Sequence, residues 1–207
     1  MTYVVTYIEV QANATDKGMD LIRRYQASSQ EEAGNAAVEA FQETHRRNRF
    51  VIGETWKEES AFQAHERAAH TAAFRSGLGE IQISPGDQRV HQVFEIEETG
   101  RAVSADALFV VTHVDVPPPR REETEVLLRR IAQQARQDEG NMRYDVFQQI
   151  SPRTNHFSVV ASWHDLTAFT RYEMKPHTRQ FREALGPMLG APYEDRLYAL
   201  VGTAVLL

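Results

Sequence analysis

Three side chains in the C-terminal half of the chain could together bind an aromatic molecule and move a proton. Tyr144 lies in a stretch that alternates apolar and polar residues, Trp163 ends the next apolar stretch, and His177 follows in a helical stretch. Tryptophan and tyrosine offer flat apolar surfaces with one polar atom, and histidine changes its protonation near neutral pH. We therefore hypothesise that His177 is the acid–base group, Tyr144 a hydrogen-bonding group and Trp163 a stacking surface.

His177 has a further feature that would keep its imidazole available as a proton acceptor. Pro176 precedes it, and proline suits the first turn of a helix because its φ angle is fixed near the helical value. The partial positive charge of a helix N-terminus disfavours a nearby imidazolium ion. A helical segment that begins at Pro176 therefore favours a neutral ring at His177.

The same pattern occurs twice in the sequence. Matching residues recur at one constant spacing, which becomes one residue longer after a single insertion. The matches include Val4-Val5-Thr6 with Val110-Val111-Thr112, Gly34-Asn35 with Gly140-Asn141, Phe41-Gln42 with Phe147-Gln148, Asn48 with Asn155, Trp56 with Trp163, His70-Thr71 with His177-Thr178, and Phe74-Arg75 with Phe181-Arg182. A run of matches with one short gap indicates two copies of one fold.

The first copy supplies a second set of candidate catalytic residues. Trp56 and His70 repeat the tryptophan and histidine of the second copy, whereas Val38 stands where that copy has its tyrosine. His65 lies between Trp56 and His70, and its place in the second copy is taken by Tyr172. The further candidates for contact with a substrate are Tyr172, His113, Phe181, Asn155, His65, Tyr7 and Phe74. Each could instead be a core, turn or surface residue, and we predict that the second copy is the better site.

Composition and charge exclude several classes of function. The chain has 207 residues and a formal net charge of −6, with both signs spread along it and no basic tract that would bind nucleic acid. No apolar run is long enough to span a bilayer, and the first residues lack the pattern of a signal peptide. We expect a cytoplasmic protein that acts on a small molecule.

A metal site is not expected from the sequence. Cysteine is absent, which excludes thiolate ligands and disulfides. His65 and His70 are too far apart in sequence to share one face of a continuous helix, as a spacing of about four residues would allow. We also expect no flavin or haem, because no dinucleotide-binding fingerprint is present.

Periodicity predicts the order βαββαβ in each half. Strands are expected at 3–11, 36–43, 49–56, 89–96, 108–116, 142–150, 155–163 and 196–203. Helices are expected from Thr15 or Asp16 to Ala33, at 58–75, at 121–139, and at 166–185 with a break at Pro176. This order is the ferredoxin-like arrangement, in which both helices cover one face of a four-stranded antiparallel sheet.

Two such sheets can cover each other's bare faces. We therefore expect an α+β fold in which two tandem ferredoxin-like domains form an intramolecular dimeric α+β barrel. The expected domains are 1–97 and 108–207, joined by a small and polar linker at 98–107. Such a chain would be a monomeric pseudo-dimer or would assemble further into a homo-oligomer.

The order Glu139-Gly140-(x)3-Tyr144, then Trp163, then Pro176-His177-(x)3-Phe181 resembles the antibiotic biosynthesis monooxygenase domain. That family includes quinol and anthrone monooxygenases. The resemblance implies oxidation of an electron-rich phenolic or polycyclic substrate by O2 without metal, flavin or other cofactor. It also implies an apolar pocket with a few polar groups for the substrate oxygen and a base for its proton.

Two other functions are compatible with the same resemblance. Haem-binding and haem-degrading relatives exist, but they use an asparagine on the first strand, where this chain has Tyr7 or His113. The third possibility is a non-catalytic ligand-binding or sensing barrel whose pockets are filled by side chains. The absence of a tyrosine at Val38 fits a first copy that serves mainly as the partner of the second.

Overall fold

The computed structural model describes residues 1–96, 104 and 106–201, which divide into two compact units. Unit 1 comprises Met1–Gln92 and the described residues from Ala199 onward, and unit 2 comprises Val93–Tyr198. Most of the linker expected at 98–107 lies outside the described residues. The domain boundaries 1–97 and 108–207 therefore stay a prediction.

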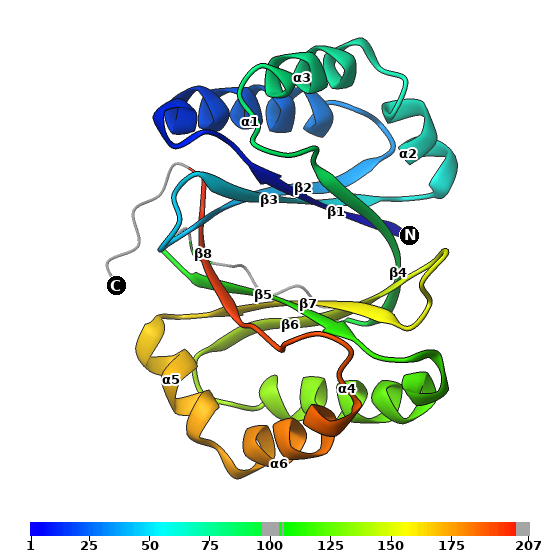
Figure 1. Cartoon of the computed structure of the whole chain (residues 1–207), viewed down its shortest axis with the longest axis vertical. Helices are drawn as coiled ribbons and strands as arrows, with labels where there is room; N and C mark the ends of the chain where they lie inside the picture. Colours follow the sequence, from blue (N-terminus) through cyan, green and yellow to red (C-terminus); the bar gives the residue numbers. More distant parts are fainter. Residues whose placement is uncertain (97–103, 105, 202–207) are drawn as a thin grey trace. The chain divides into compact units, whose positions relative to one another are not determined.

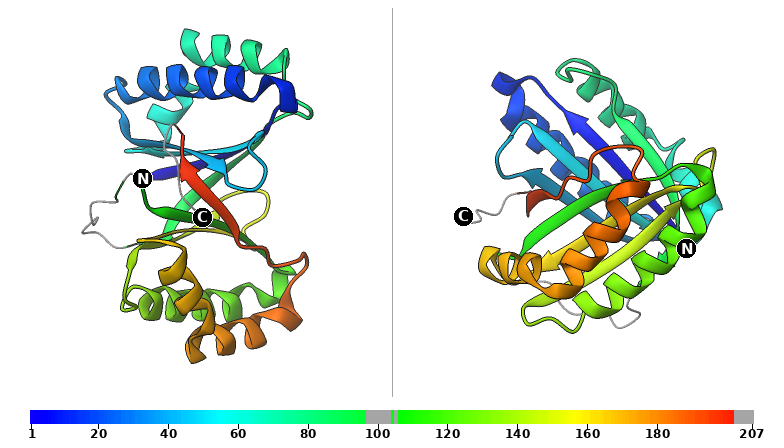
Figure 2. Two further views of the ribbon diagram at one scale, coloured as in Figure 1. Left: turned by 90° about the vertical axis from the view of Figure 1, so that its left-hand side faces the viewer. Right: turned by 60° about the horizontal axis from the view of Figure 1, so that its bottom comes forward.

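Unit 1 is a four-stranded antiparallel sheet with its long helices on one face (Figures 1 and 2). Its strands are β1 (Thr2–Glu9), β2 (Asn35–Glu43), β3 (Arg49–Trp56) and the first part of β4 (Asp87–Glu95), and its helices are η1 (Ala12–Ala14), α1 (Thr15–Gln30), α2 (Glu59–His65) and α3 (Ala69–Gly79). Strand β1 pairs with β3 and β4, and β3 pairs with β2. Inward residues of the strands, such as Phe50 and Ile52, pack against Ile22 of α1 and Phe74 of α3.

Unit 2 repeats this arrangement. Its strands are β5 (Leu108–Asp115), β6 (Asn141–Gln149), β7 (His156–Trp163) and the first part of β8 (Arg196–Leu200), and its helices are η2 (Pro118–Arg120), α4 (Arg121–Ala135), α5 (Leu166–Met174), α6 (Pro176–Leu185) and η3 (Gly186–Met188). Strand β5 pairs with β7 and β8, and β7 pairs with β6. The core combines Leu128 and Ile131 of α4 with Phe157, Val159 and other strand residues.

The strand order β1-β3-β2-β8-β5-β7-β6-β4 is that of a closed antiparallel barrel. Each copy has the order βαββαβ, with its second helix divided in two. The predicted fold class, two tandem ferredoxin-like halves in one α+β barrel, is therefore confirmed. No helix within the described residues has the length and apolar character that a membrane crossing requires.

The single helix predicted at 58–75 is wrong, because the chain breaks it between His65 and Ala69. The Thr71 hydroxyl donates to the backbone oxygen of His65 over 2.8 Å, and the Ala68 backbone N–H donates to the same oxygen over 2.9 Å, so this carbonyl at the helix end is fully satisfied. Thr178 makes the same bond to the backbone oxygen of Tyr172 over 2.7 Å. Both copies therefore share this break, although only the second has a proline there.

Smaller differences concern the ends of the elements. Helix α1 ends at Gln30 instead of about Ala33, and α4 ends at Ala135 instead of Glu139. Gly140 has a φ of +85° and lies in the turn before β6, several residues after the end of α4. The last strand was expected to reach residue 203, and its final two residues lie outside the described chain.

Candidate active site in unit 1

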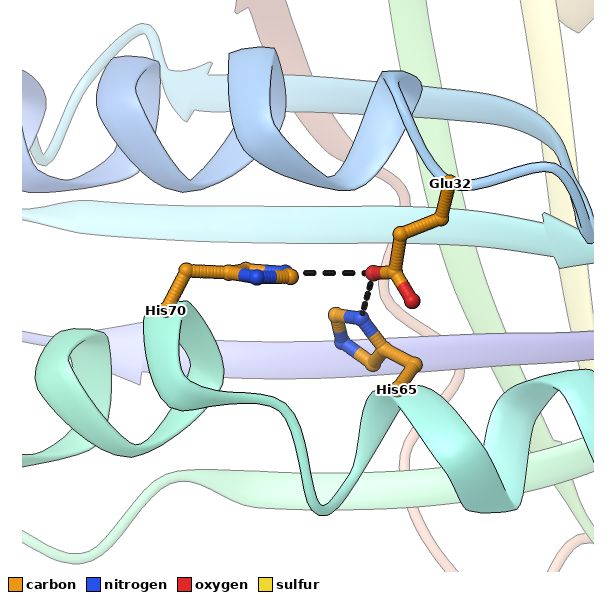
Figure 3. Close-up of side chains that lie close together, drawn as sticks. All are labelled: Glu32, His65 and His70. Carbon is orange, nitrogen blue, oxygen red and sulfur yellow. Dashed lines mark hydrogen bonds and ion pairs between the residues drawn. The ribbon is translucent and has the colours of Figure 1, made fainter.

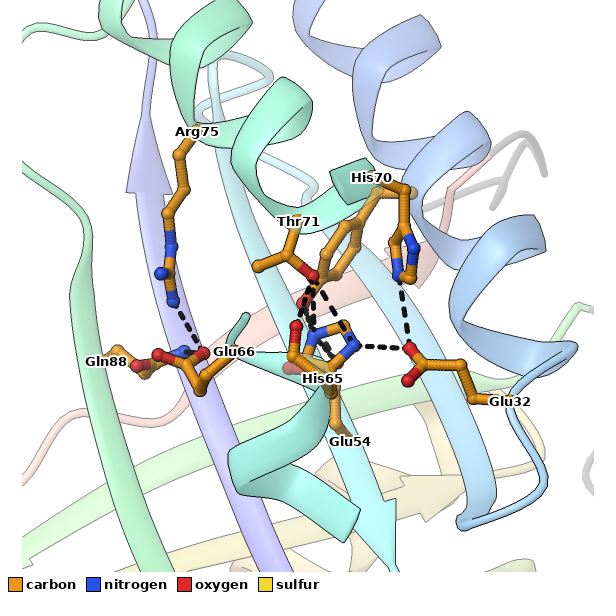
Figure 4. Close-up of polar contacts among 9 residues, drawn as sticks. Glu32, Glu54, His65, Glu66, His70, Thr71, Arg75 and Gln88 are labelled. Carbon is orange, nitrogen blue, oxygen red and sulfur yellow. Dashed lines mark hydrogen bonds and ion pairs between the residues drawn. The ribbon is translucent and has the colours of Figure 1, made fainter. Parts of the chain in front are cut away.

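His65 is a fully buried histidine with polar partners on both ring nitrogens (Figure 4). It is the last residue of α2, and the tilted ring of Trp56 lies 4.6 Å from its own. Its Nε2 lies 2.7 Å from the Tyr25 hydroxyl and 3.4 Å from Oε1 of Glu54. Its Nδ1 lies 2.6 Å from Oε1 of Glu32. Buried polar groups with such complete pairing hold a ring in one orientation.

The partners on Nε2 come from α1 and β3. Residues of a strand alternate between its two faces, so Glu54 points to the same side as the buried Phe50, Ile52 and Trp56. Glu54 is fully buried, and the Tyr25 hydroxyl lies 3.0 Å from its Oε1. Its other carboxyl oxygen has no hydrogen-bond partner among the described residues. A charged side chain thus occupies a position that the pattern of the strand assigns to the core.

Burial sets the protonation of this cluster. It raises the pKa of the Glu54 carboxyl to about 7, although the hydrogen bond from Tyr25 works in the opposite direction. Burial, and then the nearby charge of Glu54, raise the pKa of the Tyr25 phenol. Burial also lowers the pKa of His65, against the hydrogen bond to Glu32. Each group therefore favours its neutral form.

A neutral His65 carries one ring proton, and its position decides the direction of the other hydrogen bonds. The short contact between Nδ1 and the Glu32 carboxylate requires a proton on Nδ1, because two acceptors would repel each other. Nε2 is then an acceptor, and the Tyr25 hydroxyl can donate to it or to Glu54. A chain of hydrogen bonds therefore leads from Tyr25 through His65 to Glu32, which is partly exposed.

Tyr25 also forms part of the wall of a pocket in unit 1. The pocket has a volume of about 360 Å³, and its lining residues are Thr6, Ile8, Tyr25, Ile52, Thr71, Phe74, Arg75, Leu78, Gln82, Pro85, Gly86 and Gln88. Phe74 stacks on Tyr25 with ring centres 4.1 Å apart. Arg75 and Gln88 both donate to Glu66 beside the pocket (Figure 4). The lining thus combines apolar and polar side chains, and Tyr25 connects it to the cluster around His65.

Unit 2 has a different set of residues at the matching positions. Tyr172 stands in the place of His65, Ile131 in the place of Tyr25, and Ala161 in the place of Glu54. The Tyr172 and Tyr144 hydroxyls lie 3.2 Å apart, and burial raises the pKa of both phenols. The phenol in unit 1 is that of Tyr25 on α1, whereas the corresponding phenol in unit 2 is that of Tyr144 on β6. The residues that match His65 and Glu54, namely Tyr172 and Ala161, supply neither an imidazole nor a carboxylate.

The histidine predicted to be catalytic makes a partly buried hydrogen bond to a carboxylate in unit 2. Nε2 of His177 lies 2.9 Å from Oδ2 of Asp138, and its ring centre lies 6.1 Å from that of Tyr172. In unit 1 the matching pair is His70 and Glu32, with Nε2 and Oε1 3.1 Å apart. Proline begins α6 and places His177 in its first turn, as expected. The repeated pair ties the second helix of each copy to the turn after the first.

The pocket of unit 2 does not include the predicted trio. Its volume is about 400 Å³, and it is lined by Glu173, Arg182, Leu185, Gly186, Leu189, Tyr193 and Asp195. Tyr193 occupies the position that matches Gly86 of unit 1, and its ring meets the edge of Phe181. Asp195 accepts hydrogen bonds from Thr112 and Arg182, and burial raises its pKa in spite of them. The acidic cluster therefore differs in chemistry from the pocket of unit 1.

The remaining candidates have other contacts. Trp56 and Trp163 are fully buried and pack against His65 and Tyr172 respectively, with neither lining the two pockets. The Asn155 amide donates to the backbone oxygen of Val116 over 2.5 Å, as Asn48 does to Val10. His113 lies 3.3 Å from the Ser158 hydroxyl, and Arg89 lies over the ring of Tyr7. Phe74 alone of this group lines a pocket.

Sequence reasoning missed Tyr25, Glu54 and Glu32. Tyr25 lies on the inner face of its helix, where the sequence pattern alone indicates a core residue. Glu54 carries a recognisable signal, namely a carboxylate at an inward position of an apolar strand. The argument against proximity of His65 and His70 is wrong, because the helix break brings their ring centres within 5.3 Å.

Known proteins share sequence similarity with this chain. The sequence model described as "Antibiotic biosynthesis monooxygenase" matches residues 1–77 and 107–184. The curated "Putative monooxygenase YcnE" of Bacillus subtilis (strain 168) is 29% identical over 87 residues, which are 42% of this chain and 92% of YcnE.

Solved structures show the same fold over almost the whole chain. A "putative monooxygenase" from Fusobacterium nucleatum subsp. nucleatum ATCC 25586 matches with a TM-score of 0.83 and 14% identity, over 97% of this chain and 92% of that one. An "anthrone oxidase-like protein" matches with a TM-score of 0.76 and 13% identity, over 97% and 91% of the two chains. At these identities the likeness extends to the fold alone.

Proposed function

Because the chain belongs to the antibiotic biosynthesis monooxygenase family, we propose that unit 1 oxidises an electron-rich phenolic substrate of the quinol or anthrone type with O2. The observation that carries this proposal is the chain of hydrogen bonds Tyr25–His65–Glu32, which begins in the wall of a pocket that several apolar side chains line. Such a pocket suits a flat aromatic molecule, and the chain of hydrogen bonds supplies a route for its proton.

The residues of unit 1 divide the work between binding and proton transfer. Phe74, Ile52 and Leu78 offer apolar surface to the rings of the substrate. Tyr25 faces the substrate and passes a proton to Nε2 of His65, while it takes one from the substrate. His65 can release its Nδ1 proton to Glu32. Glu54 holds the Tyr25 hydroxyl in place from the other side.

The overall reaction needs no reductant other than the substrate. An anthrone loses a proton from its activated CH2 group, and the resulting anion passes an electron to O2. The radical pair combines to a peroxide at that carbon, and loss of water leaves a ketone. One oxygen atom of O2 enters the product and the other leaves as water, so the atoms and electrons balance. The protein's part is to stabilise the anion and exclude bulk water.

The contacts favour unit 1 as the reacting copy, the reverse of the ranking drawn from the sequence. In unit 2 the Tyr144 and Tyr172 hydroxyls lie beside each other and no imidazole takes the place of His65, while His177 is engaged by Asp138 and is not among the residues that line the pocket. Tyr193, which lines the pocket of unit 2, stands at the sequence position that matches Gly86 of unit 1. The proposal therefore assigns no oxidation to unit 2.

The experiment that tests this function exploits the difference at Gly86. A side chain here points into space bordered by the Tyr7 backbone oxygen and Thr6, with contacts no closer than 3.5 Å. Gly86→Tyr copies the residue of unit 2 and should close the pocket of unit 1, which lowers turnover by about tenfold or more. The assay is oxygen uptake with an anthrone and a hydroquinone, with mass spectrometry of the product formed under ¹⁸O2.

Tyr193→Phe is the matched control, because it alters the same position in unit 2 without opening or closing the pocket of unit 1. Its turnover should stay near that of the unaltered protein. No ¹⁸O in any product, or equal turnover in Gly86→Tyr, would refute oxidation in the unit 1 pocket.

A further inference from the structure

Three groups of unit 1 that commonly bind metals converge on one point (Figure 3). Oε1 of Glu32, Nδ1 of His65 and Nε2 of His70 all lie within 4.8 Å of one another. They come from the turn after α1, the end of α2 and the first turn of α3. The break between α2 and α3 thus turns two histidines, which one straight helix would separate, toward one carboxylate.

The chemistry and the setting of these groups suit a divalent transition-metal ion. Imidazole and carboxylate are ligands for zinc and its neighbours in the first transition row. A histidine that binds a metal usually donates its second ring N–H to an acceptor, and here Nε2 of His65 faces Tyr25 and Glu54. His65 is buried, whereas the side chains of Glu32 and His70 are 24% and 27% exposed, which gives an ion and its water ligands access.

The present distances need only a small adjustment. Ligand atoms about 2.1 Å from a tetrahedral ion lie about 3.4 Å from one another. Glu32 Oε1 now lies 2.6 Å from His65 and 3.1 Å from His70, so these two pairs must open by less than about 1 Å. The two histidine nitrogens lie within 4.8 Å of each other and must close by at most about 1.4 Å. Glu32 belongs to a turn, and a change of its side-chain torsions can provide this movement.

We propose that unit 1 binds one divalent transition-metal ion through Glu32, His65 and His70. Unit 2 provides the internal comparison, because Asp138 and His177 repeat two of the ligands while Tyr172 replaces the third. The expected stoichiometry is therefore one ion per chain and not two.

Occupation of this site has a consequence that rests on the proposed function. A metal on Nδ1 of His65 displaces the proton from that nitrogen, and the neutral ring must then carry its proton on Nε2. Nε2 becomes a donor toward Tyr25 and Glu54 and can no longer accept the Tyr25 proton. The ion should therefore inhibit the oxidation, and a chelator should restore it.

Binding is tested on the whole protein after treatment with a chelator. Co²⁺ is the probe for visible absorption, and Zn²⁺ is titrated by calorimetry. We expect one ion per chain, with affinity at least about tenfold lower in His70→Gln and unchanged in His177→Gln, which alters the matching histidine of unit 2. Glu32→Gln provides an independent loss of one ligand should His70→Gln fail to fold.

Absence of saturable binding, or equal affinity in the ligand variants, would overturn the proposal. Two ions per chain would also do so, because unit 2 lacks the third ligand. Inhibition is scored separately by oxygen uptake with and without Zn²⁺. Binding without inhibition retains the metal site and contradicts only the role of His65 in proton transfer, whereas binding in a protein with no oxidase activity leaves the site standing and removes the proposed function.

Discussion

Replacement of Tyr25 by phenylalanine should lower the rate of oxygen uptake by on the order of a hundredfold or more, the usual contribution of a positioned acid–base group. The substitution removes one oxygen and retains the ring that stacks on Phe74 at 4.1 Å. It breaks the path from the pocket to His65, and leaves Glu54 without its hydroxyl partner. The measurement is the initial rate with an anthrone or hydroquinone at saturating O2.

Tyr144→Phe is the matched control in unit 2, where the substitution removes an equally buried hydroxyl from a tyrosine pair. It should change the rate by less than about threefold, since Tyr144 is hydrogen-bonded to Tyr172 where Tyr25 of unit 1 is hydrogen-bonded to an imidazole. Both variants should keep the circular dichroism spectrum of the unaltered protein. If Tyr144→Phe is the more damaging change, unit 2 is the reacting copy and the ranking from the sequence is correct.

Gly140→Ala should destabilise the protein by about 2–5 kcal/mol, because two costs fall on one residue. Its φ of +85° is unfavourable for a residue with a Cβ atom, and that atom would lie 2.5 Å from Cβ of Ala168 on α5. The free energy of unfolding in urea measures the effect. Glycine is therefore required by both the backbone conformation and the close approach of the helix.

Gly34→Ala separates these two costs. A Cβ atom here would lie 2.4 Å from Cβ of Ala61 on α2, but Gly34 does not have a positive φ. The expected loss is about 1–3 kcal/mol from the contact alone, and Ala61→Gly should recover most of it. In unit 2 the double variant Gly140→Ala with Ala168→Gly should still have a free energy of unfolding about 1–2 kcal/mol below that of the unaltered protein. Full recovery in both units would contradict a conformational cost at Gly140.

The fold could be predicted from the sequence because it depends on features that both copies share. Alternating strands, glycines before β2 and β6, and a tryptophan at the end of β3 and β7 recur in register, so each copy supports the interpretation of the other. The helix break after His65 was missed, since no proline marks it. A threonine hydroxyl six residues later donates to the His65 carbonyl, and such a contact is visible only in three dimensions.

The candidate site was harder to predict for a related reason. Comparison of the copies directs attention to residues that match, such as His70 and His177, and these make the repeated ion pair with an acidic residue. The groups that meet in unit 1, Tyr25, Glu54 and His65, are those that the second copy lacks. Their convergence depends on how α1, β3 and α2 meet in the fold, and residue spacing along the chain does not reveal this.

Fusion of the two copies into one polypeptide has a consequence for how they can diverge. Two identical chains that associate must carry the same side chain at both equivalent positions, so a change that improves one site alters the other equally. In a tandem repeat the two equivalent positions are encoded separately, so each can change alone. One copy can hold a buried imidazole and carboxylate at the expense of packing. The other has Tyr172 and Ala161 in the same places and so buries no ionisable imidazole or carboxylate at these positions. Substitutions in unit 1 can therefore be read against an unaltered equivalent within the same molecule.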